Sequence, residues 1–391
     1  MRADMRLTAQ STATGLELGT ILVSFELSQS HWVLTFQVAN STKMSRHGVT
    51  ARDTDGVLAL LQRYCVRQAA DQTVGAVRVV SIQEAGLDGF WLHRWLEAQG
   101  VESHGVDAAS IAAPRRKRRA KSDGIDGETL VRTLAAWLRR EPRVCSMVVP
   151  PSVAAEDRRR LSRERERLLR EQTALTNRVK GLLASQGITG YQPLKKDRRS
   201  ALDALRNHAG HQLPPHLAAE LGRMLGRVEL LLEQIKAVEA ERDALLTAER
   251  TNDADDTPIA VLLLKLRALG NEFTAVLLLE CFYRSFGNRR QLAAFAGLAP
   301  TPWRSGSIRR EQGISEAGNP RLRKTMMELA WLWLRYQPGS ALSRWFQAKV
   351  KGAGPRARRI AIVALARKLL VALWRYVKDG VVPEGAVLKP A

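Results

Sequence analysis

A hydroxyl-bearing segment flanked by arginines is the stretch of this 391-residue chain whose residue types could do covalent chemistry. The run WRSGS places Ser305 and Ser307 next to Arg304, and Arg309 and Arg310 follow. A serine hydroxyl attacks an electrophile such as a phosphate only when a base or a metal ion activates it. Guanidinium groups stabilise charge on phosphate oxygens. The same composition also suits a plain polar connection, and these residues alone do not separate the two interpretations.

The flanking residues predict how this segment is positioned. After an apolar helical run, Pro300 and Pro302 break the chain into an irregular, basic loop. Asn319 followed by Pro320 is typical of an N-cap and a first helical position, and a helix is expected to run on towards Trp333. The free N–H groups and partial positive charge at a helix N-terminus suit a phosphate.

Carboxylates in the N-terminal third form a second candidate set. Glu26 ends one apolar run and Glu84 follows another, and Asp123 and Asp126 share one face of a predicted helix because they are three residues apart. Oxygen ligands of this kind suit Mg²⁺, and a pair of ions can activate an attacking oxygen and stabilise a leaving one. Each carboxylate taken singly fits an ordinary surface charge, and it is their joint placement that favours a metal site.

The elements that position these carboxylates are predicted to form an α/β domain over residues 1–150. Strands are expected at 21–27, 31–39, 74–82 and 100–106, and helices at 51–68, 88–99 and 123–140. This β-β-α-β-α-β order indicates a mixed sheet. The basic run at 113–121 is expected to be a mobile loop that contacts backbone phosphates through Arg115, Arg116, Lys117, Arg118, Arg119 and Lys121.

Residues 151–256 show the pattern of a coiled coil. In the first helix, leucines recur every seven residues at Leu161, Leu168, Leu175 and Leu182. In the second, apolar spacings alternate between four and three at Leu217, Leu221, Met224, Val228, Leu231, Ile235 and Val238, and Arg242 is expected to break the seam. Such heptads predict a coiled-coil seam. The two helices, linked by 187–215, could pair with each other or with a second protomer.

Residues 257–391 are predicted to form a helical domain that carries the serine segment. Apolar helices are expected at 259–269 and 274–283, on either side of Gly270, and further helices at 340–350 and 356–378. The last helix shows an apolar stripe at Ile360, Val363, Leu369, Leu373 and Val377.

The overall charge indicates a polyanionic partner. The chain has 61 Lys and Arg against 39 Asp and Glu, a net charge of +22. This charge is spread along the chain, which favours nucleic acid over a membrane surface. The cysteines Cys65, Cys145 and Cys281 form no CxxC pair, so we expect no cysteine-based zinc site and a reducing cytoplasm. No signal peptide or transmembrane run is expected.

Five segments agree with one known family. They are QEAGLDGFWLHRWLEAQG (83–100), KSDGIDGETLVRTL (121–134), LRALGNEFTAVLLLE (266–280), AGLAPTPWRSGSIRREQGISEAGNPRLRKTMMELA (296–330) and AIVALARKLLVALWRYVKDG (361–380). Together they resemble the DEDD-type transposases of bacterial insertion sequences, the insertion-sequence 110 group, whose members are bridge-RNA-guided recombinases. The first two correspond to acidic blocks of the family's RuvC-like (RNase H-like) domain, and the fourth corresponds to its C-terminal block.

The resemblance implies a DEDD metal site and a serine nucleophile. The acidic set falls on Glu26, Glu84, Asp123 and Asp126, which would hold Mg²⁺, and the nucleophile falls on Ser305. Glu26 stands where the family usually has Asp. Its extra methylene moves the carboxylate outward by roughly one C–C bond, which predicts an altered Mg²⁺ affinity because this ion demands octahedral geometry.

Strand exchange would then pass through a covalent phosphoserine. No histidine lies near the serine in sequence, so activation would come from metal held by the acidic set, arriving from another domain or protomer. Ser315 matches the family's "IS" position and is expected to be structural or to contact phosphate. Charge stabilisation is expected from Arg304, Arg309, Arg310 and Arg323.

The resemblance also implies partners. A structured bridge RNA would read sequence while the protein holds nucleic-acid backbones by charge. Double-stranded donor and target DNA would be the substrates, and the coiled coil would join protomers into dimers that assemble to a tetramer, in the bacterial cytoplasm at the nucleoid and without a membrane. Two other interpretations stay open: a metal-dependent junction-resolving nuclease, and a non-catalytic coiled-coil protein that organises nucleic acid.

Overall fold

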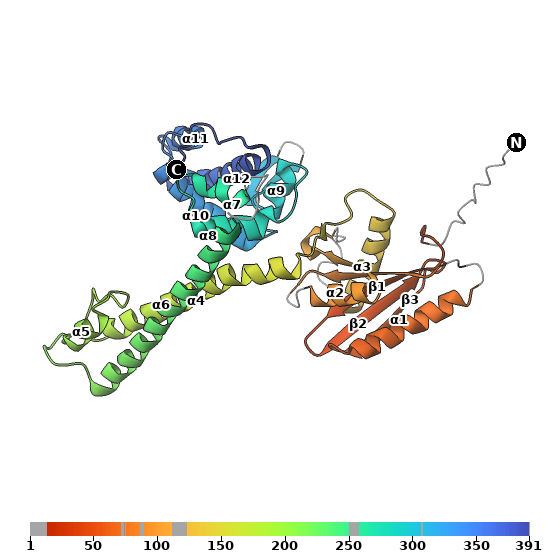
Figure 1. Ribbon diagram of the computed structural model, residues 1–391, viewed down its shortest axis with the longest axis horizontal. Coiled ribbons are helices and arrows are strands. Elements are labelled where there is room, and N and C mark those ends of the chain that lie inside the picture. The colour runs from red at the N-terminus through yellow and green to blue at the C-terminus, as the bar shows by residue number, and fades with distance from the viewer. Residues whose placement is uncertain are drawn as a thin grey trace. The chain divides into compact units, whose positions relative to one another are not determined.

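The computed structural model describes residues 14–71, 74, 76–86, 90–111, 123–249, 258–305 and 308–390. Contacts divide the chain into two compact units, Met1–Pro150 and Pro151–Ala391, and each is described by itself. The first is a mixed α/β unit and the second is largely helical (Figure 1), which confirms the predicted fold class at this level. No helix within the described ranges has the length and apolar character needed to span a membrane.

A six-stranded sheet forms the centre of the first unit, in the order β3-β2-β1-β4-β5-β6. Its strands are β1 (Thr20–Leu27), β2 (His31–Val38), β3 (Met44–Thr50), β4 (Arg78–Glu84), β5 (Glu102–Val106) and β6 (Met147–Val148). β1, β4 and β5 run parallel to one another, whereas β2, β3 and β6 are antiparallel to their neighbours. The helices are α1 (Thr54–Ala69), α2 (Trp91–Ala98), η1 (Ala108–Ser110) and α3 (Asp123–Leu138).

The predicted β-β-α-β-α-β order was wrong because it lacked two strands. β3 precedes α1 and pairs with β2, and the two-residue β6 follows α3. The sequence of β3, MSRHGVT, has no apolar alternation, and its side chains are exposed or half-buried at the sheet edge. A strand that buries no face carries no hydrophobic period, so pattern analysis could not detect it.

β1 is the most deeply buried strand and has helices on both faces. Ile21, Val23 and Phe25 belong to one apolar cluster with residues of α1 and α2. Leu22, which lies between them, belongs to a second cluster with Leu130 and its neighbours on α3. Alternate residues of a strand point to opposite faces. The sheet therefore holds α3 on the face opposite to α1 and α2.

The second unit contains a long antiparallel helical hairpin. α4 (Val153–Ala184) and α6 (Pro215–Glu249) lie side by side, and α5 (Arg198–Asp203) lies in their connection (Figure 1). Ion pairs join Arg165 to Glu239 and Arg178 to Glu220, so residue numbers rise along α4 as they fall along α6. The two helices with the predicted heptads therefore pair with each other within one chain.

The predicted leucines of α4 all contribute to the apolar clusters of the hairpin, but three of them are not among its most buried residues. Of the leucines spaced by seven, Leu168 is buried and the other three are half-buried. The buried residues of α4 are Arg159, Ser162, Leu168, Gln172, Thr176, Val179 and Leu183. On α6, the predicted seam residues from Leu221 to Val238 are buried. The apolar seam ends at Val238, and Arg242 breaks it as predicted, because its buried side chain pairs with Glu272 of α8 (Asn271–Leu277).

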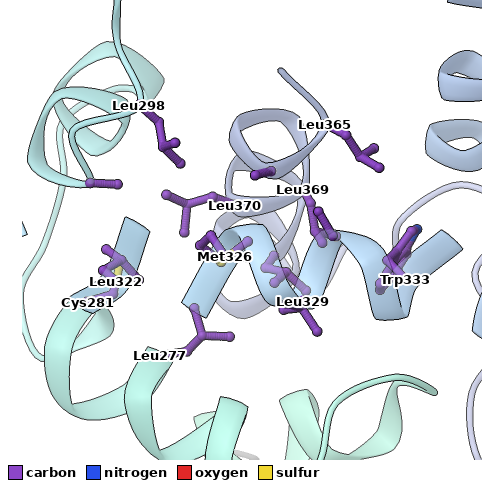
Figure 2. Packing of buried hydrophobic residues seen from close by; sticks show 14 of the residues in the cluster. Leu277, Cys281, Leu298, Leu322, Met326, Leu329, Trp333, Leu365, Leu369 and Leu370 are labelled. Carbon is purple, nitrogen blue, oxygen red and sulfur yellow. The ribbon is translucent and has the colours of Figure 1, made fainter. Parts of the chain in front are cut away.

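The rest of the second unit packs around one apolar core. Its other elements are α7 (Ile259–Lys265), the π-helical turn η3 (Leu278–Phe282), α9 (Arg289–Phe295), β7 (Pro300–Ser305), β8 (Ile308–Ile314), α10 (Pro320–Tyr336), α11 (Ala341–Val350) and α12 (Pro355–Asp379). Met326 and Leu329 of α10 face Leu369 and Leu370 of α12 (Figure 2). The predicted stripe of α12 was wrong at Ile360, which is exposed, because the helix buries the neighbouring positions instead.

Candidate active site

Glu26 and Glu84 lie at the carboxyl ends of neighbouring parallel strands. β1 and β4 pair in register as far as Phe25 opposite Gln83, and the two glutamates are the next residue of each strand. Glu26 is half-buried and Glu84 is exposed. The sheet thus sets these two backbone positions side by side at one edge.

The N-terminal part of α3 packs against the same end of β1. The hydroxyl of Ser24 donates to the carbonyl oxygen of Gly127 over 3.0 Å, in a buried hydrogen bond. Asp126, which precedes Gly127, is half-buried, and Asp123 begins the helix one turn earlier. α3 therefore brings Asp126 to the region of Glu26.

The donor groups at this edge are of the kind that suits a hard divalent cation. A Cβ placed on Gly127 would lie 2.5 Å from Oε1 of Glu26 and 3.3 Å from Oγ of Ser24, so carboxylate and hydroxyl oxygens converge on the helix backbone. Mg²⁺ takes oxygen ligands, and the residues present fit it chemically. Among the described side chains, which exclude that of Asp123, no three His, Cys, Asp or Glu groups lie close enough together to hold a metal ion.

The basic run predicted to contact phosphates lies outside the described residues. The described chain stops at Ile111 and resumes at Asp123, so the gap contains Arg115, Arg116, Lys117, Arg118, Arg119 and Lys121. Their predicted contact with nucleic acid stays a prediction.

The segment that holds Ser305 is a β-hairpin, and the prediction of an irregular loop was wrong. β7 and β8 pair antiparallel, with Ser305 opposite Ile308, and the register shifts between Pro300 and Pro302. Proline lacks a backbone N–H, but each strand of a two-stranded ribbon has a free edge, so a bulged ribbon tolerates both prolines. The prolines that suggested a loop are therefore compatible with a strand.

The arginines predicted to stabilise charge beside the serine lie on this ribbon. Arg304 is opposite Arg309 and Trp303 is opposite Arg310 in the strand register. Each of these three arginines therefore lies within two residues of Ser305 or of Ile308, the partner of Ser305 in the register. Only the backbone is described for 302–305 and 308–312, and residues 306 and 307 lie outside the described chain.

Two glycines fix the base of the serine hairpin by close backbone contact. Gly297, with φ +65°, and Gly318, with φ +108°, occupy backbone conformations that disfavour a side chain. A Cβ on Gly318 would lie 2.7 Å from the carbonyl oxygen of Ala294, and one on Gly297 would lie 2.6 Å from that of Ala317. The chain entering the hairpin and the chain leaving it therefore meet through positions that suit only glycine.

Hydrogen bonds close the same base. The N–H of Ser315 donates to the carbonyl oxygen of Ala299 over 2.9 Å. Nη1 of Arg323 reaches back from α10 and donates to the carbonyl oxygen of Glu316 over 2.7 Å. Arg323, which was predicted to stabilise phosphate charge, therefore also stabilises the base of the serine hairpin.

Helix α10 begins at the predicted N-cap. Oδ1 of Asn319 accepts from the N–H groups of Arg321 (3.0 Å) and Leu322 (3.1 Å), and Pro320 is the first helical residue. The N–H of Asn319 itself donates to the carbonyl oxygen of Phe295 over 2.7 Å. Two of the helix's free N–H groups are therefore used by the cap, which leaves fewer of them for the phosphate expected at this N-terminus.

Glu280 in η3 is a buried acid that the sequence analysis did not single out. Its side chain is 5% exposed, accepts from Nε of Arg163 on α4 over 2.9 Å, and accepts from Nδ2 of Asn319 over 3.0 Å. Nε of Arg321 lies 3.7 Å from it. Glu280 therefore links α4 to the N-cap of the helix that follows the serine hairpin. An acid isolated in the apolar run 275–283 was the available sequence signal.

Glu166 of α4 makes a second link to α10. Its carboxylate oxygens lie 2.6 Å from Nη1 of Arg321 and 3.2 Å from Nζ of Lys324. Partial burial raises the pKa of Glu166, but the nearby Arg321 and Lys324 outweigh this effect, so its pKa lies below the usual value. The helical hairpin and the base of the serine hairpin thus share one polar network.

Comparisons with known proteins agree on one family. Residues 260–345, which contain the serine hairpin, match the family described as "Transposase IS116/IS110/IS902 family". The chain is 54% identical to the protein y4rJ of Sinorhizobium fredii, named as a transposase, over 97% of each chain. It is 27% identical to the transposase for insertion sequence element IS1328 of Yersinia enterocolitica, over 67% of this chain and 73% of that one. It is 29% identical to the transposase for IS1111A of Coxiella burnetii, over 57% and 59%.

Proposed function

Because this chain belongs to the IS116/IS110/IS902 family of transposases, enzymes that break and join DNA strands, we propose that it recombines DNA through a phosphoserine formed at Ser305. The proposed metal ligands are Glu26, Glu84, Asp123 and Asp126, and Mg²⁺ bound there would supply Lewis-acid polarisation of oxygen. The observation that carries this proposal is that Glu26 and Glu84 lie near the carboxyl ends of neighbouring parallel strands, where α3 packs.

The strand order supports a RuvC-like (RNase H-like) assignment for the first domain. A central β1 has the antiparallel β2 and β3 on one side and the parallel β4 and β5 on the other. Helices cover both faces of this sheet. We assign residues 1–150 to this domain, 151–256 to an antiparallel coiled coil, and 257–391 to the helical transposase domain.

The chemistry proposed for Ser305 is a reversible transesterification. Its Oγ would form a bond to the scissile phosphorus and displace a deoxyribose oxygen, which gains a proton while Ser305 loses one. Attack by a deoxyribose hydroxyl of another strand would restore the serine and join the DNA. Arg304, Arg309 and Arg310 of the same ribbon and Arg323 at its base would neutralise the phosphate oxygens.

The proposed partners are a structured bridge RNA and double-stranded donor and target DNA. The net charge of +22 supports binding to nucleic-acid backbones, with sequence read by the RNA. Assembly to a dimer and then a tetramer would use other faces of the helical hairpin, since α4 and α6 bury their seam against each other. The proposed location is the bacterial cytoplasm, at the nucleoid.

The test of this function is the covalent adduct between protein and DNA. We expect Ser305→Ala to bind nucleic acid and to form no adduct with a labelled DNA substrate, as measured on denaturing gels. Ser307→Ala is the matched control, because it removes the neighbouring hydroxyl and should leave the adduct intact. An adduct that survives Ser305→Ala would rule out this nucleophile.

The same assay separates the alternative functions. A junction-resolving nuclease that uses water would give hydrolysed ends and no adduct in the unmodified protein. A non-catalytic organising protein would give neither product, and Asp126→Ala would change nothing. Sequencing of the RNA that co-purifies with the protein tests the bridge RNA, because one discrete structured species is expected and random RNA would contradict it.

A further inference from the structure

Gly127 of α3 lies closer to the sheet than a residue with a side chain could. A Cβ at this position would be 2.5 Å from Oε1 of Glu26, nearer still to Oγ1 of Thr35, and 3.3 Å from Oγ of Ser24. Non-bonded heavy atoms pack at about 3.5–4.0 Å, so an alanine at 127 forces one of these groups or the helix to move.

The three side chains around Gly127 differ in how far they can move away from an added methyl group. Ser24 and Thr35 are paired across β1 and β2, and both side chains are fully buried. Thr35 is β-branched, so its χ1 angle is stiff. Ser24 is held by its hydrogen bond to the carbonyl of Gly127 itself. Glu26, half-buried near the strand end, has the longest and most adjustable side chain of the three.

The helix is also fixed on the sheet. Leu130, Val131 and Leu134, in the turns of α3 that follow Gly127, are at most 2% exposed and pack in the core beneath β1 and β4. A shift of α3 away from the sheet would therefore uncover apolar surface. An added methyl group is expected to displace the Glu26 carboxylate, or to tilt the start of α3 that carries Asp126.

We propose that Gly127 is a positioning residue coupled to Glu26, and that the absent side chain at 127 makes room for a glutamate at the first acidic position. The inference rests on the proposed metal-binding role of the acidic set. Aspartate is shorter than glutamate by one methylene, so in a Glu26→Asp variant the carboxylate would withdraw from position 127. Once the closer Thr35 contact is also removed, alanine at 127 should be tolerated in the Glu26→Asp variant and not in the chain that keeps Glu26.

The test is a mutant cycle in a Thr35→Ala background, which removes the other close contact. The Thr35 hydroxyl has no hydrogen-bond partner among the described residues. Its removal therefore breaks no hydrogen bond among them. Binding of Mn²⁺, a paramagnetic substitute for Mg²⁺, is measured on the full chain by electron paramagnetic resonance. Gly127→Ala is expected to weaken binding about 10- to 100-fold, the range typical of groups that orient metal ligands.

Adding Glu26→Asp to the Gly127→Ala variant is expected to raise its Mn²⁺ affinity again by at least about tenfold. Equal Mn²⁺ affinity with glycine or alanine at 127, or a loss that is the same with either acid at 26, would overturn the coupling. Should alanine at 127 prevent folding, recovery of the thermal transition by Glu26→Asp supports the pair, and continued failure to fold overturns it.

Two controls separate this inference from the proposed function. Glu26→Gln should abolish Mn²⁺ binding, and full binding in that variant would refute the acidic set itself. If Glu26→Gln abolishes binding and Gly127→Ala does not weaken it, the coupling alone fails. Gly222→Ala is the matched glycine control, because a Cβ there meets no atom within 4 Å, and it should leave Mn²⁺ affinity unchanged.

Discussion

The acidic edge of the first unit and the serine hairpin of the second unit are positioned by different means. At the acidic edge, Glu26, Glu84 and Asp126 come from three elements that are distant in sequence and are held by a buried sheet and an apolar helix face. The serine hairpin is a local excursion between α9 and α10 that is fixed at its base by backbone contacts.

The two sites are therefore expected to be sensitive to different substitutions. The acidic edge depends on space between packed elements, so an added methyl group at Gly127 is expected to disturb it. The serine hairpin depends on two glycine conformations and on Arg323, so changes at its base are expected to disturb it while the sheet of the first unit stays intact.

The largest expected effect on stability is at the hairpin base. Gly318→Ala would place a methyl group against the carbonyl oxygens of Phe295 and Ala294, at a φ of +108°. We expect a loss of about 3 kcal/mol in the unfolding free energy of the second unit, from backbone strain and steric overlap. Urea unfolding measures it, with Gly339→Ala as control because a Cβ there meets no atom within 4 Å. Equal losses for both variants would show that Gly318 does not fix the base.

The second expected effect concerns the buried acid that joins α4 to α10. Glu280→Gln keeps the shape of the side chain but removes the charge that faces Arg163. We expect a loss of about 2 kcal/mol, below the usual figure for a broken buried pair because the Arg163 side chain is 46% exposed. Glu328→Gln on the exposed face of α10 is the control and should stay within about 0.5 kcal/mol. A Glu280→Gln variant as stable as that control would refute the link.

Sequence patterns predicted the parts of this molecule that bury one apolar face or use local capping chemistry. The runs that end at Glu26 and Glu84 were recognisable as strands because they are β-branched and apolar. Asn319 and Pro320 were recognisable as a cap because the hydrogen bonds involved are local. The seam of α6 followed from its heptad spacing.

Other parts could not be predicted because they depend on contacts between distant residues. The strand β3 buries no face, and the ribbon of β7 and β8 contains prolines that usually mark loops. The contact of Gly127 with Glu26 and Thr35 exists only once α3 packs on the sheet, so no local pattern reveals it. Glu280 reads as an isolated charge until Arg163 of α4 is placed beside it.

A smaller effect of opposite sign on the unfolding free energy is expected along the helical hairpin, where two glycines have room for a side chain. Gly181 on α4 and Gly222 on α6 are helical, and a Cβ at either meets no atom within 4 Å. Alanine at each position should raise the unfolding free energy by about 0.5–1 kcal/mol, because glycine loses more backbone entropy in a helix. Destabilisation by either change in urea unfolding would contradict the open space described there.

The smallest expected effect is the pH dependence contributed by Glu166. Its pKa in the folded chain lies below the usual carboxyl value of 4.5 because Arg321 and Lys324 outweigh the effect of burial. A lowered folded pKa means that this stabilisation is fully present above about pH 4.5 and is lost as pH falls through the folded value.

Glu166→Gln should therefore be less stable than the unmodified chain at pH 7, and the difference should shrink as the pH falls below about 4.5. Thermal unfolding of both proteins across this pH range measures the difference in stability. The titration of all other carboxylates is common to both proteins and cancels in this difference. A constant difference from pH 7 to pH 3 would mean that packing, and not charge, accounts for the contribution of Glu166 to the network that holds the serine hairpin.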